Sequence, residues 1–383
     1  MTDIGPLVLG PIAHGGHCVA HIDGRVVFVR HGIPGEIVRV RITDDSKPRF
    51  WWGEVAEVIE ASSDRLASPC PVAGVCGGCA FQHIALDRQR DLKAQVITEQ
   101  LHRLAGIDRN VQVEAAPGES DGLGWRTRMR YLTDEGRFGL RAWRSDQMVD
   151  LSDVGCAIAH PNGRWAAAHH AQRNREIQVI VADSGISVID GSGYCLSGAP
   201  EVTQTVSGRR YQVRADGFWQ VHPSAAQALT DAVVDMLEPS PGELALDLYC
   251  GVGLFAGRLV DEGCQVIGVE IGRAAIAMAR YNVPQARFRV GPTERLLSAL
   301  PRHVDLIVLD PPRSGAGAKV VRHLSHVGAR AIAYVACDPA ALARDLATFA
   351  DHSYRLADLR ALDLFPMTHH VECVAILKPA TRT

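Results

Sequence analysis

The strongest constraint on the fold is a set of short apolar runs in the last third of the chain, each followed by a segment of helix length. Three of these runs cover residues 265–270, 304–310 and 331–336, and another ends at Asp247. Strands that alternate with helices in this way form a doubly wound parallel sheet. Ligands of such sheets bind beyond the carboxyl ends of the strands, so the residues there are the first candidates for a functional site.

Four reactive side chains fall at these predicted strand ends: Asp247, Glu270, Asp310 and Cys337. Cys337 lies between an apolar strand and a helix for which Asp338 is the expected N-cap and Pro339 the first residue. Unpaired N–H groups and the positive end of the helix dipole favour a thiolate there, as a nucleophile requires. A small buried core residue is the alternative, because free cysteine is among the most buried residue types.

A glycine turn follows Asp247 and predicts a cofactor site. Gly251-Val-Gly253-Leu-Phe-Ala256 fits the dinucleotide fingerprint, and Glu270 lies about 20 residues on, where a ribose-binding acid belongs. The turn alone permits NAD or S-adenosylmethionine. Asp310-Pro311-Pro312-Arg313 fixes a carboxylate at the end of another strand, with nothing nearby that resembles a hydride-transfer site. Structural prolines that end a strand are the alternative.

A group of cysteines predicts a metal or cluster site. Cys70, Cys76 and Cys79 lie within ten residues, and Gly77 and Gly78 let the backbone between them fold tightly. Cys156 is the best candidate for a fourth ligand, because no nearer cysteine follows. A structural zinc site usually has paired C-x-x-C motifs, which are missing, whereas a four-iron cluster accepts uneven spacing. Both alternatives remain open on the spacing alone.

Residues 126–144 predict an RNA-binding hairpin with its turn near residues 134–136. Six arginines occur in this stretch, namely Arg126, Arg128, Arg130, Arg137, Arg141 and Arg144. Tyr131, Phe138 and Trp143 are interleaved with them, so one face could present guanidinium groups and rings to phosphates and unstacked bases. A solvated charged face is the alternative.

The remaining pattern gives the domain organisation. We expect an OB-like β-barrel of five short strands over residues 1–62, a mixed α+β central domain over 63–215 and the doubly wound domain over 216–383. A net charge of −3 limits RNA contacts to local patches. No apolar run is long enough for a membrane helix and the start lacks a basic signal region, so we expect a cytoplasmic protein. In that compartment the ten cysteines point to metal or catalytic roles rather than disulfides.

The stretches DLYCGVGLFA, DPPR, VACDPAALARDL and FPMTHHVECVAIL, in this order, resemble the RNA 5-methyluridine methyltransferase family. The segment CPVAGVCGGC and the N-terminal barrel, which resembles a TRAM domain, fit the same family, so the resemblance runs essentially end to end. It implies an S-adenosylmethionine-dependent enzyme that makes 5-methyluridine in tRNA or rRNA. It also implies that Cys70, Cys76, Cys79 and Cys156 hold a four-iron, four-sulfur cluster, which we expect to be structural.

The resemblance assigns roles to single residues. Cys337 would be the nucleophile that adds to carbon 6 of uracil, and Glu372 the base that removes the carbon-5 proton. The implied cofactor-binding residues are Gln220, Tyr249, Gly251, Glu270 and Asp310. Three departures from the family pattern, at His222, at Leu254 and in the turn after Gly291, concern individual cofactor contacts and not the reaction.

We expect RNA as the partner, reached by flipping the target uridine out of its stack, and a monomer with no obligate protein partner. Two alternatives come from other classes. One is an RNA-binding iron–sulfur protein without catalysis, against which the intact Cys337, Asp310 and Glu372 argue. The other is an NAD-dependent oxidoreductase that uses the cluster for electrons.

Overall fold

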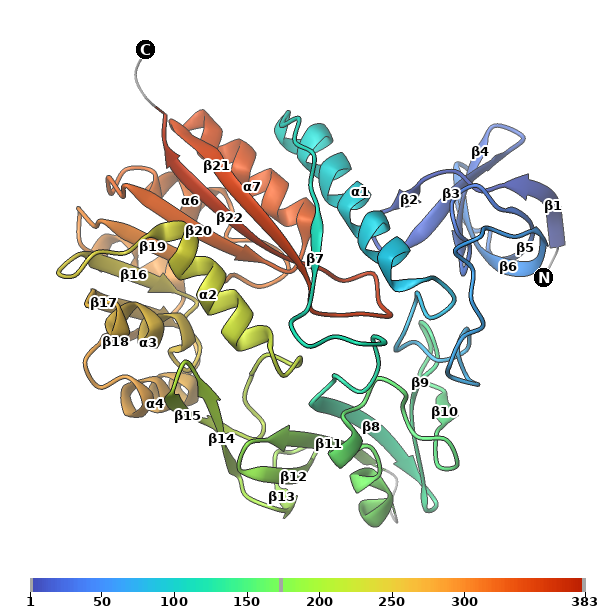
Figure 1. Cartoon of the computed structure of the whole chain (residues 1–383), viewed down its shortest axis with the longest axis horizontal. Coiled ribbons are helices and arrows are strands. Elements are labelled where there is room, and N and C mark those ends of the chain that lie inside the picture. Colours follow the sequence, from blue (N-terminus) through green and yellow to red (C-terminus); the bar gives the residue numbers. More distant parts are fainter. Residues whose placement is uncertain (1–2, 172–174, 381–383) are drawn as a thin grey trace.

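The computed structural model of the protein describes residues 3–171 and 175–380. The N-terminal sheet and the large C-terminal sheet lie at opposite ends of the molecule, with the central segment between and below them (Figure 1). Among the described residues, no helix combines the length and the apolar character needed to cross a membrane.

The N-terminal segment forms a barrel-like sheet of six strands, one more than predicted, in the order β1-β5-β6-β4-β3-β2. Its strands are β1 (Asp3–Val8), β2 (Ile12–Ala13), β3 (His17–Ile22), β4 (Arg25–Arg30), β5 (Ile37–Asp44) and β6 (Phe50–Glu60). Alternate residues such as Val27 and Val29, or Val38 and Val40, point inward and form its core.

The central segment is built on an antiparallel sheet in the order β10-β9-β8-β11-β12-β13. Its elements are β8 (Arg128–Asp134), β9 (Arg137–Arg141), β10 (Met148–Asp150), η1 (Pro161–Gly163), η2 (Ala166–His170), β11 (Arg175–Ala182), β12 (Gly185–Asp190) and β13 (Cys195–Ser197). The predicted arginine-rich hairpin is confirmed, because β8 and β9 pair across the turn at residues 135–136. A separate hairpin of β14 (Glu201–Val206) and β15 (Arg209–Arg214) leads towards the C-terminal segment.

The C-terminal sheet has eight strands in the order β18-β17-β16-β19-β20-β22-β21-β7. Its strands are β16 (Leu244–Leu248), β17 (Gln265–Glu270), β18 (Arg287–Val290), β19 (Leu306–Leu309), β20 (Ala331–Ala336), β21 (Tyr354–Asp363) and β22 (Glu372–Pro379), together with β7 (Val113–Ala115). The helices of this segment are α2 (Ala225–Leu237), α3 (Leu254–Asp261), α4 (Arg273–Asn282), α5 (Thr293–Leu296), η3 (Leu297–Ala299), α6 (Ala318–Leu324) and α7 (Pro339–Asp351).

Helices cover both faces of this sheet, which confirms the predicted doubly wound α/β class. Residues of α2, α3 and α4 share one core with Ala245 and Val308, whereas residues of α6 and α7 share the other core with Leu246 and Ile307. The expectation of an all-parallel sheet needs one correction. Strand β22 runs antiparallel to both of its neighbours, because the chain returns from β21 through a hairpin-like loop instead of a crossover helix.

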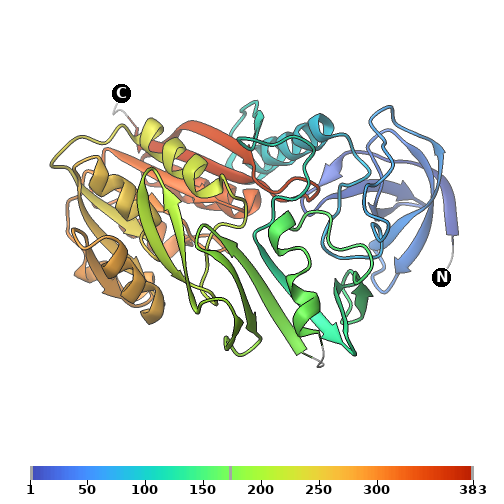
Figure 2. The ribbon, with the colours of Figure 1, turned by 60° about the horizontal axis from the view of Figure 1, so that its bottom comes forward.

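A long helix from outside this segment completes the second face. Helix α1 (Leu86–Ala105) ends at Gly106, whose left-handed φ of 63° lets its N–H reach the carbonyls of Leu101 and His102. Ile97 and Leu101 of α1 belong to the core that α6 and α7 form against the sheet. In both views α1 lies between the C-terminal strands and the N-terminal sheet (Figures 1 and 2). The segment before β8 therefore joins the two ends of the molecule.

Candidate active site

The turn after β16 forms one half of the site. Tyr249, Gly251 and Gly253 all adopt left-handed φ values, of 65°, 52° and 90°, which fold the chain tightly into α3. A Cβ atom added to Gly253 would lie 3.2 Å from a methyl carbon of Val283, so the turn packs closely on its neighbours. The predicted glycine turn is thus present between a strand and a helix, which is the context a cofactor fingerprint requires.

Glu270, at the end of β17, is fixed by this turn. Its carboxylate accepts the N–H of Gly272 at 2.7 Å and the N–H of Gly251 at 3.3 Å. Asp247 lies beneath the turn, fully buried, and one of its oxygens accepts the N–H of Ala256 at 2.8 Å. Its other oxygen, Oδ1, has no hydrogen-bond partner among the described residues. Burial raises the pKa of Asp247 well above its ordinary value, and Asp310 and Glu270 add to the shift.

Asp310 follows β19 and lies between the two halves of the site. Burial raises the pKa of its carboxyl to about 7. Its charge raises the pKa of Asp247 in the first half of the site, and the pKa values of Glu372 and Cys337 in the second half.

Cys337 begins the second half, and the predicted local structure around it is confirmed. It follows β20 directly, Asp338 caps α7 by accepting the N–H of Ala341 at 2.8 Å, and Pro339 is the first helical residue. The expected stabilisation of a thiolate is wrong for the free protein. Burial raises the pKa of the Cys337 thiol to about 11, and the charges of Glu372, Asp310 and Asp338 oppose ionisation further. Arg313 is the neighbour that lowers it.

Glu372 is the first residue of β22, and its side chain is buried. Burial raises the pKa of its carboxyl well above the ordinary value, Asp310 acts in the same direction, and Arg313 acts against it. Arg313 therefore favours the charged form of both Cys337 and Glu372. Cys337 follows the end of β20 and Glu372 begins the neighbouring strand β22, and the charge of Glu372 raises the pKa of Cys337.

Two cavities share part of their lining, and the smaller one contains Cys337. The smaller one, of about 150 Å³, is lined by residues that include His14, Arg313, Cys337 and Asp338. The larger one, of about 660 Å³, lies between the N-terminal sheet and the β8–β9 hairpin. His369 and His370, whose rings lie 4.1 Å apart, line both. The pocket around the thiol thus continues into a wider cavity shared by two segments of the chain.

The predicted placing of arginines and aromatic rings on one face of the hairpin is only partly correct, and RNA binding there stays a prediction. Four of the arginines line the larger cavity, namely Arg126, Arg130, Arg141 and Arg144. Arg128 instead donates to the carbonyls of Ala215 and Gly217. Tyr131 and Phe138 are not available for stacking, because both lie in the core of the central segment. Successive side chains of a strand point to opposite faces of the sheet, and Tyr131 and Phe138 point to the inner face.

Trp143 does line the larger cavity, held between two guanidinium groups. Arg30 of the N-terminal sheet lies 3.9 Å from the centre of a Trp143 ring, and Arg144 lies 4.5 Å from it. Arg144 also lies 4.4 Å from the centre of Trp52. These cation–π contacts gather positive charge and flat surface from two segments at the wall of one cavity.

The amino-acid sequence matches the family described as tRNA (uracil-5-)-methyltransferase over residues 176–290 and 300–380, and the TRAM domain over residues 7–55. A protein of Streptomyces coelicolor named as an uncharacterized RNA methyltransferase is 45% identical, over 98% of this chain and 92% of the relative. A protein of the same description from Bifidobacterium longum is 37% identical over 94% and 93% of the two chains. The chain belongs to the tRNA (uracil-5-)-methyltransferase family.

The fold agrees with that membership. The crystal structure of a Pyrococcus abyssi tRNA (uracil-54, C5)-methyltransferase in complex with S-adenosyl-L-homocysteine superposes with a TM-score of 0.74 at 23% identity. The match covers 97% of this chain and 99% of that one. The predictions of a methyltransferase fold, of an enzyme of this family and of a TRAM domain are confirmed.

The four predicted cluster cysteines of this family member act on one another electrostatically. Burial raises the pKa of the Cys79 thiol to about 12, and Cys156, Cys76 and Cys70 each add to the shift. All are free thiols, and the N–H of Gly78 points at the Cys76 sulfur at 3.4 Å. Within residues 3–171 and 175–380, however, no three His, Cys, Asp or Glu side chains are arranged as metal ligands. The cluster therefore stays a prediction.

Gln220 and His222 lie in the turn before α2, and both side chains are buried. The ring of His222 stacks on the buried ring of Trp125, with the ring centroids 5.8 Å apart. Sequence reasoning missed three residues at the site: His14, His369 and His370. The two neighbouring histidines stood in a motif that carried the resemblance, which was the available signal. His14 had no such signal, because its position beside Cys337 depends on contacts between segments more than 300 residues apart.

Proposed function

We propose that this protein transfers a methyl group from S-adenosylmethionine to carbon 5 of a uridine in RNA, through a covalent bond between Cys337 and carbon 6 of the base. The observation that supports this most directly is that Cys337 and Arg313 line one small pocket while the charges of Glu372 and Asp310 act on Cys337, in a member of this family.

The chemistry requires a nucleophile, because carbon 5 of uracil is too weakly nucleophilic to take a methyl group unaided. When the Cys337 thiolate bonds to carbon 6, the 5,6 double bond opens and carbon 5 gains the electron pair of an enolate. In the free protein the thiol holds its proton, so that proton must pass to a base as the bond forms. Arg313 favours this step because its positive charge lowers the pKa of the thiol.

Glu372 would complete the reaction. After methylation, carbon 5 carries both a methyl group and a proton, and the carboxylate takes that proton. The sulfur–carbon bond then breaks, the double bond returns and the thiolate leaves. Glu372 must be ionised to act, although burial raises its pKa, so the positive charge of Arg313 assists this step too.

The cofactor side of the sheet fits S-adenosylmethionine, which supplies an electrophilic methyl group on a sulfonium. Glu270 would accept from the ribose hydroxyls, and Gln220, Tyr249, Gly251 and Asp310 would make the other contacts. The buried Oδ1 atom of Asp247 lacks a partner within the described residues, as expected where a ligand donor is missing. The charge of Asp310 raises the pKa of both Asp247 and Cys337, so Asp310 links the two halves of the site electrostatically.

The larger cavity would take the RNA. Its arginines can pair with phosphates, and the Trp143 ring, which lines the same cavity, offers an aromatic contact for a base. A stacked uridine cannot reach a thiol that lies in a small pocket, so the target base would flip out of the RNA and into it. Both tRNA and rRNA remain candidates for the substrate.

We also propose that Cys70, Cys76, Cys79 and Cys156 hold a four-iron cluster with a structural role, since no step above needs an electron. The mutual effect of the four thiols on their pKa values and the tight backbone at Gly77, where a side chain would meet Arg141 O at 3.1 Å, support this. Anaerobically purified protein should contain iron and acid-labile sulfide, and Cys79→Ser should lower both. Protein without iron under these conditions would overturn the cluster.

A covalent trap tests the reaction. Fluorine cannot leave carbon 5 as a cation, so 5-fluorouridine RNA incubated with protein and S-adenosylmethionine should give a shifted band on a denaturing gel. Cys337→Ala should abolish the band, and the matched variant Cys195→Ala, on β13, should keep it. Glu372→Gln should accumulate a methylated adduct with ordinary RNA. Arms with tRNA and with rRNA fragments identify the substrate class.

If no RNA gives a band with protein that binds S-adenosylhomocysteine, catalysis through Cys337 is wrong. An RNA-binding protein without catalysis would then be the better description.

A further inference from the structure

One turn of the N-terminal sheet reaches into the site. His14, Gly15 and Gly16 connect β2 to β3, and all three line the pocket that contains Cys337. The imidazole Nε2 of His14 lies 3.1 Å from Oδ2 of Asp338, the residue that follows Cys337. A TRAM domain is thus in contact with the nucleophile's own turn.

Gly16 shows how closely this turn is seated. With its left-handed φ of 81°, it packs so that an added Cβ would meet the Cβ of His369 at 2.7 Å and the ring of Phe81 at 3.2 Å. A side chain at this position would push the turn away from the pocket or displace His369. The N-terminal sheet is therefore fitted against both sides of the pocket, at Asp338 and at His369.

The two oxygens of Asp338 have separate partners. Oδ1 accepts the N–H of Ala341 and so fixes the first turn of α7, while Oδ2 faces His14. A carboxylate held at both oxygens cannot rotate, and the backbone that carries it also carries Cys337. The charge of Arg344 also acts on Asp338, and those of Arg313, Asp310 and Glu372 act on Cys337.

We propose that His14 is a positioning residue of the methyl-transfer site, through which the N-terminal sheet holds Asp338 and thereby the Cys337 turn in the orientation for attack. The inference rests on the proposed function of Cys337 and adds a second task to a domain that would otherwise only contact RNA.

Stability alone does not account for this contact. The side chains of His14 and Asp338 are 40% and 22% exposed, and ion pairs this accessible contribute little to folding. The effect on reaction geometry can be much larger, because a misplacement of about 1 Å at a reacting atom can cost about 100-fold in rate. A positioning role therefore predicts a loss of rate without a loss of stability.

The test compares His14→Ala with His14→Gln, whose side-chain amide can still donate to Asp338. The readout is the rate of adduct formation with 5-fluorouridine RNA at saturating concentration, with the RNA affinity measured separately. We expect His14→Ala to slow adduct formation by about 10- to 100-fold, His14→Gln to restore most of it, and RNA affinity to change little. His21→Ala, an exposed histidine of the same sheet, should match the wild type.

Gly16→Ala gives a second approach with a close control. It should slow adduct formation because the new methyl group displaces the turn. Gly24→Ala carries the same backbone penalty, at φ 74°, but has nothing within 4 Å of the new atom and lies in the β3–β4 turn. It should leave the adduct rate unchanged. Binding of S-adenosylhomocysteine confirms that each variant is folded.

The outcomes are distinct. A wild-type protein that forms no adduct overturns the proposed function and this inference with it. If the wild type forms the adduct and His14→Ala and Gly16→Ala form it at the wild-type rate, the inference about His14 is wrong while the proposed function stands. A loss in His14→Ala that appears only as weaker RNA binding makes His14 an RNA contact and also contradicts the positioning role.

Discussion

The two halves of the site are built in different ways. The half proposed to bind the cofactor lies mostly within one short stretch of chain, from Asp247 to Gly272, where a strand, a glycine turn and the next strand supply most of the proposed contacts. Gln220 and Asp310 lie outside this stretch. The half around Cys337 gathers His14, Arg313, His369 and Glu372 from three other segments, because His369 and Glu372 share the loop between β21 and β22. A locally built site depends on backbone geometry, whereas an assembled one depends on whatever holds its segments together.

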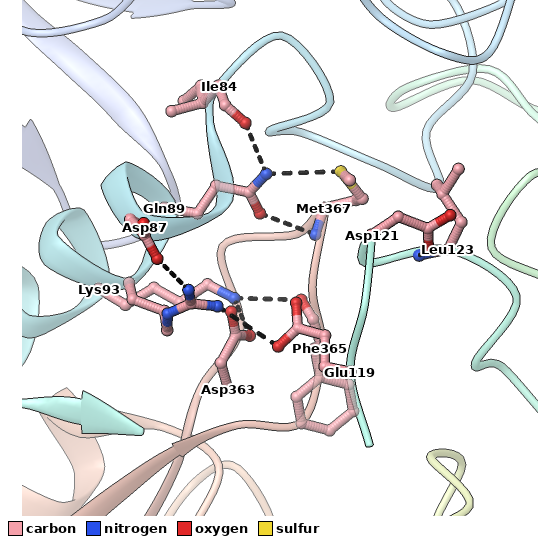
Figure 3. A network of polar contacts seen from close by, with 11 residues as sticks. Ile84, Asp87, Gln89, Lys93, Glu119, Asp121, Leu123, Asp363, Phe365 and Met367 are labelled. Carbon is pink, nitrogen blue, oxygen red and sulfur yellow. Dashed lines mark hydrogen bonds and ion pairs between the residues drawn. The ribbon is translucent and has the colours of Figure 1, made fainter. Parts of the chain in front are cut away.

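Helix α1 anchors one of these segments, the loop that leads into Glu372 (Figure 3). Gln89 accepts the N–H of Met367 at 2.8 Å and donates to the carbonyls of Phe81 and Ile84. Lys93 lies 2.5 Å from Asp363 and donates to the carbonyl of Phe365 at 3.1 Å. The loop between β21 and β22, which carries His369 and His370 and leads into Glu372, is thereby tied to α1.

Breaking the buried ion pair should give the largest change. The side chains of Lys93 and Asp363 are 1% and 0% exposed, so Lys93→Met leaves a buried carboxylate without its cation. We expect the free energy of unfolding to fall by about 3–5 kcal/mol, measured by urea denaturation. Arg39→Met, in a pair with Glu57 whose side chains are 51% and 62% exposed, should cost at most about 1 kcal/mol.

A second variant separates the lost charge pair from lost packing. In Lys93→Met with Asp363→Leu no charge is left buried, so most of the stability should return. If Lys93→Met alone costs no more than the Arg39 control, the anchoring of the loop by α1 is wrong.

A substitution at Glu270, which accepts two backbone N–H groups, should weaken cofactor binding. Glu270→Gln leaves only one oxygen to accept the N–H groups of Gly251 and Gly272 and removes the charge. We expect the affinity for S-adenosylhomocysteine, measured by calorimetry, to fall about tenfold or more, since a hydrogen bond to a charged group contributes about 1.5–3 kcal/mol. The rate of adduct formation with 5-fluorouridine RNA at saturating cofactor should change much less.

Glu262→Gln is the control for that measurement, because Glu262 pairs with Arg258 one helical turn away, at the end of α3 opposite the glycine turn. Equal affinities of Glu270→Gln and the wild type for S-adenosylhomocysteine would show that Glu270 does not hold the cofactor.

The same contrast explains what the sequence could predict. Asp338 and Pro339 are local signals for a helix start, so the strand–helix junction at Cys337 could be predicted. The glycine turn and its neighbour Glu270 could be predicted from local signals as well. The high pKa of Cys337 was not predictable, because the carboxylates of Asp310 and Glu372 arrive from other strands. The antiparallel course of β22 and the place of β7 depend on pairing between distant segments. Tyr131 and Phe138 were assigned to the wrong face for the same reason.

The smallest expected effect concerns charge at the assembled half. Arg313 is the neighbour that lowers the pKa of both Cys337 and Glu372. Since the pKa of the thiol is about 11, the thiolate fraction, and with it the rate of adduct formation, should rise as pH increases from 6.5 to 9. Arg313→Gln should raise the pKa of the thiol further and so lower the rate by about 3- to 10-fold at every pH in this range, since one pKa unit is a tenfold change in thiolate.

Saturating RNA separates this effect from weaker binding, and Arg313→Lys, which keeps the charge, should recover part of the rate. Arg302→Gln, an exposed arginine in the loop before β19, controls for loss of a positive charge in general. A rate that is independent of pH in the wild type would mean that RNA binding already ionises Cys337, and Arg313→Gln would then reach the wild-type rate. In that case the RNA, and not Arg313, would supply the charge that the assembled half of the site needs.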